Sequence, residues 1–201
     1  MYAIVTDGSI SKYINHPKRL VLNDVQYSSK IFSLWSTAEL KAKGIYEVVF
    51  DDTNKKNEQW YINTNQSFAF ANNTVTASYG SATAKAHADT LWTAQDETDG
   101  KGIEGEVATR GLKYNLIQTL KSQVAGILND TDWYITRNAE KSTAIPSAIS
   151  THRDAVRTKQ ASMETAITNA SNTPALETLY TYTTTDGVQS RPLGELPTLE
   201  I

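Results

Sequence analysis

Two apolar stripes with helical spacing run through the second half of the sequence. The first has an aliphatic residue at every fourth position: Leu112, Leu116, Leu120, Val124 and Leu128. The second opens at Ile145-Pro146, where proline suits a first helical turn, and repeats every seventh residue: Ile149, Val156, Met163 and Ala170. A helix with one narrow apolar stripe needs packing to be stable in water. Residues 107–172 are therefore predicted to form an elongated helical hairpin, packed on itself or, as a coiled coil, on partner chains.

The first 93 residues show the alternation and turn signals of short strands. Asp7-Gly8 and Asn23-Asp24 each separate two short apolar runs, a pattern typical of tight hairpin turns. Ser36 followed by Glu39 forms a helix capping box, and Gly44 is placed to end that short helix. We expect a small antiparallel β-rich N-terminal module over residues 1–93, which gives the chain an α+β fold class.

Two further segments are predicted from composition. Residues 94–106, AQDETDGKGIEGE, combine three glycines with acidic side chains and favour a flexible, solvated linker. Residues 173–201 are rich in Thr and Pro, which favours an extended C-terminal tail.

Charge and composition restrict the classes of partner. The 201-residue chain has a formal net charge of −3, and its Lys and Arg are not clustered as nucleic-acid or anionic-membrane binding would need. No apolar run approaches the length that crosses a bilayer. Because the sequence has no Cys, disulfides, thiolate metal sites and Cys nucleophiles are excluded. We expect no nucleic-acid partner and no membrane insertion.

The sequence shows no recognisable catalytic or metal-binding pattern. None of the three histidines, His16, His87 and His152, has a second ligand at a known metal spacing. A phosphate-binding glycine loop and a Gly-x-Ser-x-Gly nucleophile elbow are also missing. We therefore expect no enzyme activity, no catalytic residue, no cofactor and no metal. His152, on the apolar side of its predicted helix, is interpreted as a packing or interface residue.

Aromatic residues gather in the predicted N-terminal module. Trp60 and Tyr61 are adjacent in the sequence, so in a strand they point to opposite faces. One interpretation is that one of the two belongs to the core. The other is that Trp60 or Tyr61 stacks on a sugar or on a partner protein.

The stretch NDTDWYITR, residues 129–137, lies between the two helical patterns. Thr131 or Asp132 is predicted to cap the next helical turn, and Trp133 to cover the open end of the helical hairpin. Arg153 and Arg157 share one face of the second helix, one turn apart, and are predicted to reach carbonyls or carboxylates at this corner.

A longer stretch around this corner, ILNDTDWYITRNAEKSTAIPSAISTHRDAVRT, resembles the C-terminal motif of bacteriophage tail-fibre assembly and tail assembly chaperone proteins. Ile127-Leu128 match the paired aliphatic residues that end the family's first helix. Thr131-Asp132-Trp133 match its Thr-Asp-Trp triplet, and Arg137 matches the arginine that follows.

The resemblance continues on the second helix, which Ile145-Pro146 opens. Arg153, Val156 and Arg157 match the family's Tyr-Arg-x-x-Leu-Arg pattern, with His152 in place of Tyr and Val156 in place of Leu. The resemblance covers residues 116–159. The first 90 residues resemble the N-terminal modules of marine phage tail and virion proteins in general texture.

This resemblance implies a phage tail-associated structural or adaptor protein that attaches tail fibres or helps to assemble them in the virion. The implied partners are other tail or fibre proteins, in a homo-oligomer or a large virion assembly, after synthesis in the host cytoplasm. Seven residues are candidates for partner binding: Trp60, Tyr61, Trp133, Arg137, His152, Arg153 and Arg157. The alternatives are a receptor-binding tail tip that recognises host surface glycan, and a fibre assembly chaperone that is not retained in the particle.

Overall fold

The computed structural model describes residues 1–199 and has a mixed α+β fold. The chain divides into two compact units, one from Met1 to Thr83 and one from Ala84 onward. The short strand β9 (Thr83–Ala84) contains this boundary. Sequence composition places the end of the N-terminal module after residue 93, whereas the contacts place it between residues 83 and 84.

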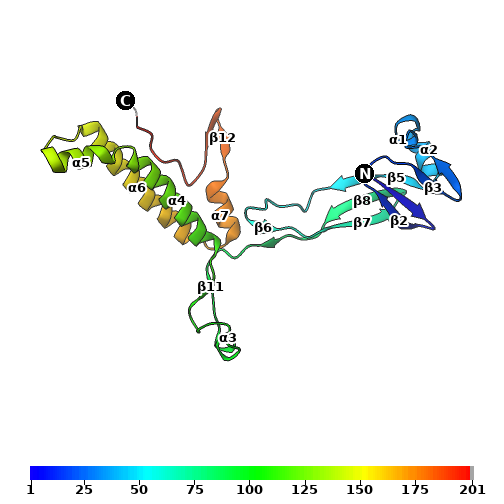
Figure 1. Cartoon of the computed structure of the whole chain (residues 1–201), viewed down its shortest axis with the longest axis horizontal. Helices are drawn as coiled ribbons and strands as arrows, with labels where there is room; N and C mark the ends of the chain where they lie inside the picture. The colour runs from blue at the N-terminus through cyan, green and yellow to red at the C-terminus, as the bar shows by residue number, and fades with distance from the viewer. Residues whose placement is uncertain (200–201) are drawn as a thin grey trace. The chain divides into compact units, whose positions relative to one another are not determined.

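The N-terminal unit is built on a five-stranded sheet with the strand order β2-β1-β5-β8-β7 (Figure 1). Its strands are β1 (Tyr2–Thr6), β2 (Ser9–Ile14), β5 (Ile45–Asp51), β7 (Gln66–Ala71) and β8 (Thr74–Tyr79). The smaller elements are β3 (Leu20–Leu22), β4 (Val25–Tyr27), α1 (Ile31–Leu34), α2 (Thr37–Ala42) and β6 (Tyr61–Ile62).

The sheet is mixed, so the expectation of a wholly antiparallel module is wrong at one strand pair. Strands β5 and β8 pair in parallel, with Val48 opposite Val75, while the other pairs are antiparallel. The free edge of β5 pairs with the second strand of the β7–β8 hairpin, which runs in the same direction as β5. Alternation in the sequence indicates a strand but not its direction, so it could not predict this pairing.

Local signals in the N-terminal unit are confirmed. Asp7-Gly8 and Asn23-Asp24 have positive φ angles at both turn positions, as two-residue hairpin turns require. The Ser36 side chain accepts from the Glu39 N–H, and the Glu39 carboxylate accepts from the Ser36 N–H, which completes the capping box. Gly44 follows that helix at φ 75°, and a Cβ there would lie 2.7 Å from the Val5 carbonyl oxygen.

The sheet has a core on each of its two faces. One cluster joins Ile4 and Ile45 to Ile31 of α1 and Leu40 of α2. The other contains Ala3, Tyr46, Val48, Val75 and Ala77. The sheet curls so far that rings from its two edge strands meet: the centroids of Tyr13 and Phe68 are 4.8 Å apart.

The C-terminal unit is dominated by two long helices, α4 (Leu112–Asn129) and α6 (Ser147–Asn169), which lie side by side (Figure 1). Their direction is antiparallel, since Lys113 at the start of α4 donates to the Thr168 carbonyl at the end of α6. Both predicted apolar stripes contribute buried residues: Leu120 and Val124 on α4, and Ile149, Val156, Met163 and Ile167 on α6. Among residues 1–199, no helix is both long enough and apolar enough to cross a membrane.

Shorter elements complete this unit, several of them in segments that composition alone favours as unstructured. They are β10 (Thr90–Leu91), α3 (Ala94–Thr98), β11 (Val107–Thr109), α5 (Asp132–Lys141), α7 (Thr173–Tyr180), β12 (Thr183–Thr185) and β13 (Val188–Ser190). Residues 94–106 begin with a helix that a Thr93–Asp96 capping box starts. The segment after residue 172 begins with a helix that the Asn172 side chain caps, so both segments differ from the expected linker and tail.

Candidate functional site

The corner between α4, α5 and α6 is organised around one buried cation. Arg153 of α6 is only 6% exposed. Its Nη1 donates to the Leu128 carbonyl oxygen at 2.7 Å and to the Thr131 hydroxyl at 2.6 Å. Its Nη2 forms an ion pair with the Asp132 carboxylate at 2.8 Å. One guanidinium therefore ties the end of α4 and the start of α5 to α6, which confirms that Arg153 reaches carbonyls and carboxylates at the corner.

Thr131 belongs to this network and does not cap α5, so the predicted capping role is wrong. Its side chain makes no hydrogen bond to the N–H groups of α5. The hydroxyl instead donates to the Leu128 carbonyl oxygen at 3.0 Å and accepts from Arg153. Asp132 is likewise engaged by Arg153. A buried guanidinium needs several hydrogen-bond acceptors. Arg153 binds the Thr131 and Asp132 side-chain oxygens, which were expected to accept from the first N–H groups of α5.

Trp133 lies on the open side of the corner, and the prediction that it covers the end of the helical hairpin is wrong. Its side chain is 51% exposed. The indole stacks against Tyr134 with the ring centroids 3.8 Å apart. The guanidinium of Arg137 lies 4.7 Å from the Trp133 ring centroid and 5.5 Å from that of Tyr134. The three side chains form one stack of two aromatic rings and a cation.

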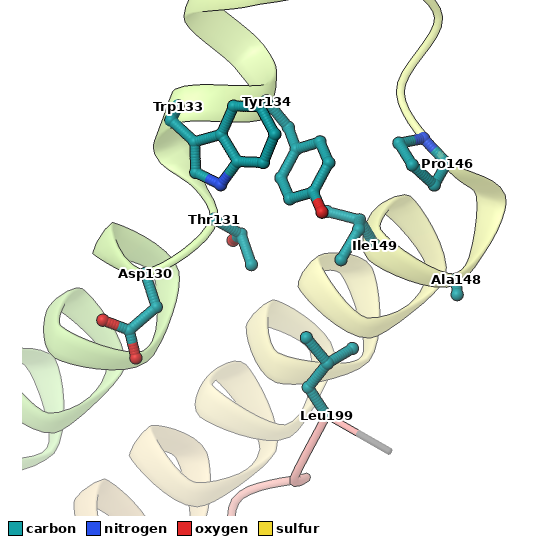
Figure 2. Close-up of a pocket in the computed structure, with 8 residues that line it drawn as sticks. All are labelled: Asp130, Thr131, Trp133, Tyr134, Pro146, Ala148, Ile149 and Leu199. Atoms are coloured by element: carbon teal, nitrogen blue, oxygen red, sulfur yellow. The ribbon is translucent and has the colours of Figure 1, made fainter. Parts of the chain in front are cut away.

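A cavity of about 520 Å³ opens beside this stack (Figure 2). Figure 2 shows Trp133 and Tyr134 on one side and Leu199 of the C-terminal segment on the other. The first residues of α6 and the α4–α5 junction supply the rest of the lining: Asp130, Thr131, Pro146, Ala148 and Ile149. Most of these side chains are apolar, as is common in sites that take a side chain or a small molecule.

Arg137 has no partner for its buried Nε among residues 1–199. No acidic side chain in that part of the chain forms an ion pair with it either. Its cation is held only against the two rings. Arg137 therefore contributes to the stack a positive charge that no acidic side chain of residues 1–199 neutralises.

His152 and Arg157 differ in position, although both were candidates for partner binding. His152 is 9% exposed and lines a smaller cavity with Ile127 and with Leu196 of the C-terminal segment, which fits the packing interpretation. The Arg157 side chain is half exposed, and its ion pair, at 3.5 Å, is with Asp154 of its own helix. The prediction that Arg157 reaches the corner is therefore wrong.

Trp60 and Tyr61 belong to the N-terminal unit and are not part of this site. Trp60 is only 2% exposed, so its ring has no free face on which a sugar could stack, and the glycan interpretation of Trp60 is wrong. Tyr61 is half-buried at the start of β6.

Tyr134 and Leu199 are not among the site residues predicted from the sequence, although both line the cavity. Tyr134 directly follows Trp133, and the paired aromatics were a signal for it that the interpretation passed over. Leu199 reaches the cavity because the C-terminal segment packs near α6. No local sequence pattern predicts this long-range contact.

Within residues 1–199, no group of three or more His, Asp or Glu side chains is placed to hold a metal ion. Comparisons with protein-family models, curated proteins and solved structures find no match to this chain. The resemblance of residues 116–159 to the tail-fibre assembly family therefore rests on the quoted residues alone.

Proposed function

We propose that this chain is a bacteriophage tail-associated structural or adaptor protein that docks a partner chain at the helix corner. One observation supports the proposal: the three residues of the Thr-Asp-Trp triplet have two different roles at the corner. Thr131 and Asp132 are held by Arg153, while Trp133 is left half exposed beside an open cavity. The resemblance to tail-fibre assembly proteins supplies the class of partner, a tail or fibre protein.

The composition of the exposed side supports docking. Trp, Tyr and Arg are the residue types that most often contribute large shares of binding energy at protein interfaces. Trp133, Tyr134 and Arg137 bring all three together on the first turns of α5. Because they already stack on one another, little side-chain entropy remains to be lost when a partner binds.

The finer description of the fold forms part of the same proposal. We assign the N-terminal unit to a β-rich module that contacts one partner, and the antiparallel α4–α6 pair to a helical hairpin that contacts another. An adaptor needs two such surfaces, and the division of the chain into two compact units suits that role. The proposal assigns no reaction to the chain.

Mass spectrometry of purified particles, with copy-number estimation, tests this function. The particles are collected from cells that express the gene in its native genome. An adaptor of the virion is expected at a fixed copy number per particle. A fibre assembly chaperone would be found in the cell lysate and be missing from the particles, and that result would reject the adaptor role.

A further inference from the structure

A second surface lies on residues 90–109, called here the acidic arm, which contain β10, α3 and β11. Figure 1 shows these elements leading away from the start of α4. The arm is a closed loop: Leu91 pairs with Val107, and the Trp92 N–H donates to the Glu106 carbonyl oxygen at 2.9 Å. Its base is fixed by Asp89, which accepts from the Gly111 N–H at 2.8 Å and pairs with Arg110 at 2.6 Å.

Contacts inside the acidic arm give it a defined shape. The capping box of Thr93 and Asp96 starts α3, and the Lys101 ammonium lies 3.1 Å from Asp96 and 3.0 Å from Asp99. Trp92 packs so closely on Gly102 that a Cβ there would overlap the indole. A loop fixed in this way loses little conformational entropy when a partner binds.

The acidic arm exposes three large apolar side chains. Leu91 is 50% exposed, Ile103 58% and Val107 37%. Leu91 and Val107 are directly opposite each other in the two-stranded ribbon, so their side chains stand on the same face. Leu91 and Ile103 therefore keep half or more of their surface in solvent, and Val107 more than a third.

The charge of the arm indicates what could cover these side chains. The arm holds five acidic residues and one lysine, a net charge of −4, whereas the whole 201-residue chain has −3. Glu104 and Glu106 lie between the exposed Ile103 and Val107 in the sequence I-E-G-E-V, and neither forms an ion pair within residues 1–199. The acidic side chains of the described arm do not converge as a metal site. The surface is complementary to a segment that carries both apolar and basic side chains.

We propose that the acidic arm docks a basic segment of a partner protein, with the partner's apolar side chains on Leu91, Ile103 and Val107. Glu104 and Glu106 pair with its Lys or Arg residues. This surface shares no residue with the helix corner, so the inference does not depend on the proposed tail function.

The test uses the full chain and three labelled synthetic peptides of equal length: alternating Lys and Leu, alternating Lys and Ser, and alternating Glu and Leu. Fluorescence anisotropy gives each Kd. The Lys–Leu peptide is expected to bind most tightly. Ile103→Ser or Leu91→Ser should weaken it about tenfold, because each removes an apolar contact. Glu104→Gln combined with Glu106→Gln should weaken it about threefold to tenfold at low salt and reduce its salt dependence.

Matched controls have the same chemistry elsewhere on the surface. Val188→Ser removes an aliphatic side chain that is 66% exposed on β13, and Glu47→Gln removes an exposed carboxylate on β5. Both should leave the Kd unchanged. Three results overturn the proposal: no binding, binding that the arm variants do not alter, or equal binding of the Lys–Ser peptide. Self-association of the chain that Ile103→Ser abolishes would identify a second copy as the occupant and also overturn it.

Discussion

Replacing Arg153 with methionine should destabilise the C-terminal unit, because this guanidinium joins three helices at the corner. Methionine keeps most of the side-chain volume, so the substitution removes the charge and the hydrogen bonds without opening a large cavity. The side chain is 6% exposed, so water does not replace the lost partners as it would at the surface.

The expected magnitude follows from the three contacts. The hydrogen bonds to Leu128 and Thr131 are charge-assisted, a class that contributes about 1.5–3 kcal/mol each. The Leu128 carbonyl keeps two other donors, the N–H and hydroxyl of Thr131, so it is not left unsatisfied. The Asp132 side chain is 55% exposed and can be hydrated, which reduces its ion pair to about 0.2–1 kcal/mol. These contacts sum to about 3–7 kcal/mol, but the desolvation cost of the buried guanidinium also disappears when methionine replaces it, so we expect a net loss of about 2–4 kcal/mol in the free energy of unfolding.

Urea unfolding followed by far-UV circular dichroism measures this loss, since the helices of the C-terminal unit dominate the signal. Arg157→Met is the matched control, one helical turn away on α6. The Arg157 side chain is half exposed and pairs with Asp154 at 3.5 Å, so its replacement should cost less than about 0.5 kcal/mol. Equal and small effects of the two substitutions would refute the assignment of Arg153 as the organiser of the corner.

Three further predictions follow from the same structure. Thr131→Val should cost about 1–2 kcal/mol in urea unfolding, because the Arg153 guanidinium loses an acceptor, whereas Thr131→Ser should cost less; equal costs would contradict the role of the hydroxyl. Trp133→Ala should change the free energy of unfolding by less than about 1 kcal/mol, since half of the side chain is already in water; a loss like that of Arg153→Met would restore the covering role. Hydrogen bonds from Thr93, and then from Lys101, lower the pKa of Asp96 to about 2. The stabilisation from this carboxylate is therefore present above pH 3.8, its ordinary pKa, and is lost as the pH falls through about 2. An NMR titration should show that midpoint, and Thr93→Val should raise it; a midpoint that Thr93→Val leaves in place would contradict the stated cause.

Local features of the fold could be predicted from the sequence. The turns at Asp7-Gly8 and Asn23-Asp24 could be predicted, because Gly, Asn and Asp are among the few residue types that tolerate the positive φ angles found there. The Ser36–Glu39 capping box is likewise decided by residues three positions apart. The apolar stripe is buried at Ile149, Val156 and Met163 of α6, whereas on α4 it is buried only at Leu120 and Val124 and half-buried at its other positions.

Features that depend on distant residues could not be predicted in the same way. The parallel pairing of β5 with β8 depends on which edge the β7–β8 hairpin meets. The capping box of Thr93 and Asp96 is not identified in the sequence analysis, because the segment is judged there by the glycine and acidic content of residues 94–106.

The candidate site was predicted only in part, for a related reason. The reach of Arg153 to the corner follows from its place on the face of α6 that packs toward α4. Helical periodicity does not indicate whether Trp133, which is 51% exposed on the first turn of α5, lies inside or outside the corner. The second arginine, Arg157, repeats the sequence pattern but lies too far along α6 and pairs within its own helix.

The most direct test of docking at the corner is the copy number of Trp133→Ala in purified particles, measured by mass spectrometry beside wild type. Val188→Ala, which removes another exposed apolar side chain, serves as the control. We expect Trp133→Ala to fold with nearly wild-type stability yet to be strongly depleted from the particles, while Val188→Ala is incorporated normally. Incorporation of Trp133→Ala at the wild-type copy number would contradict the proposal that the corner is where the partner binds.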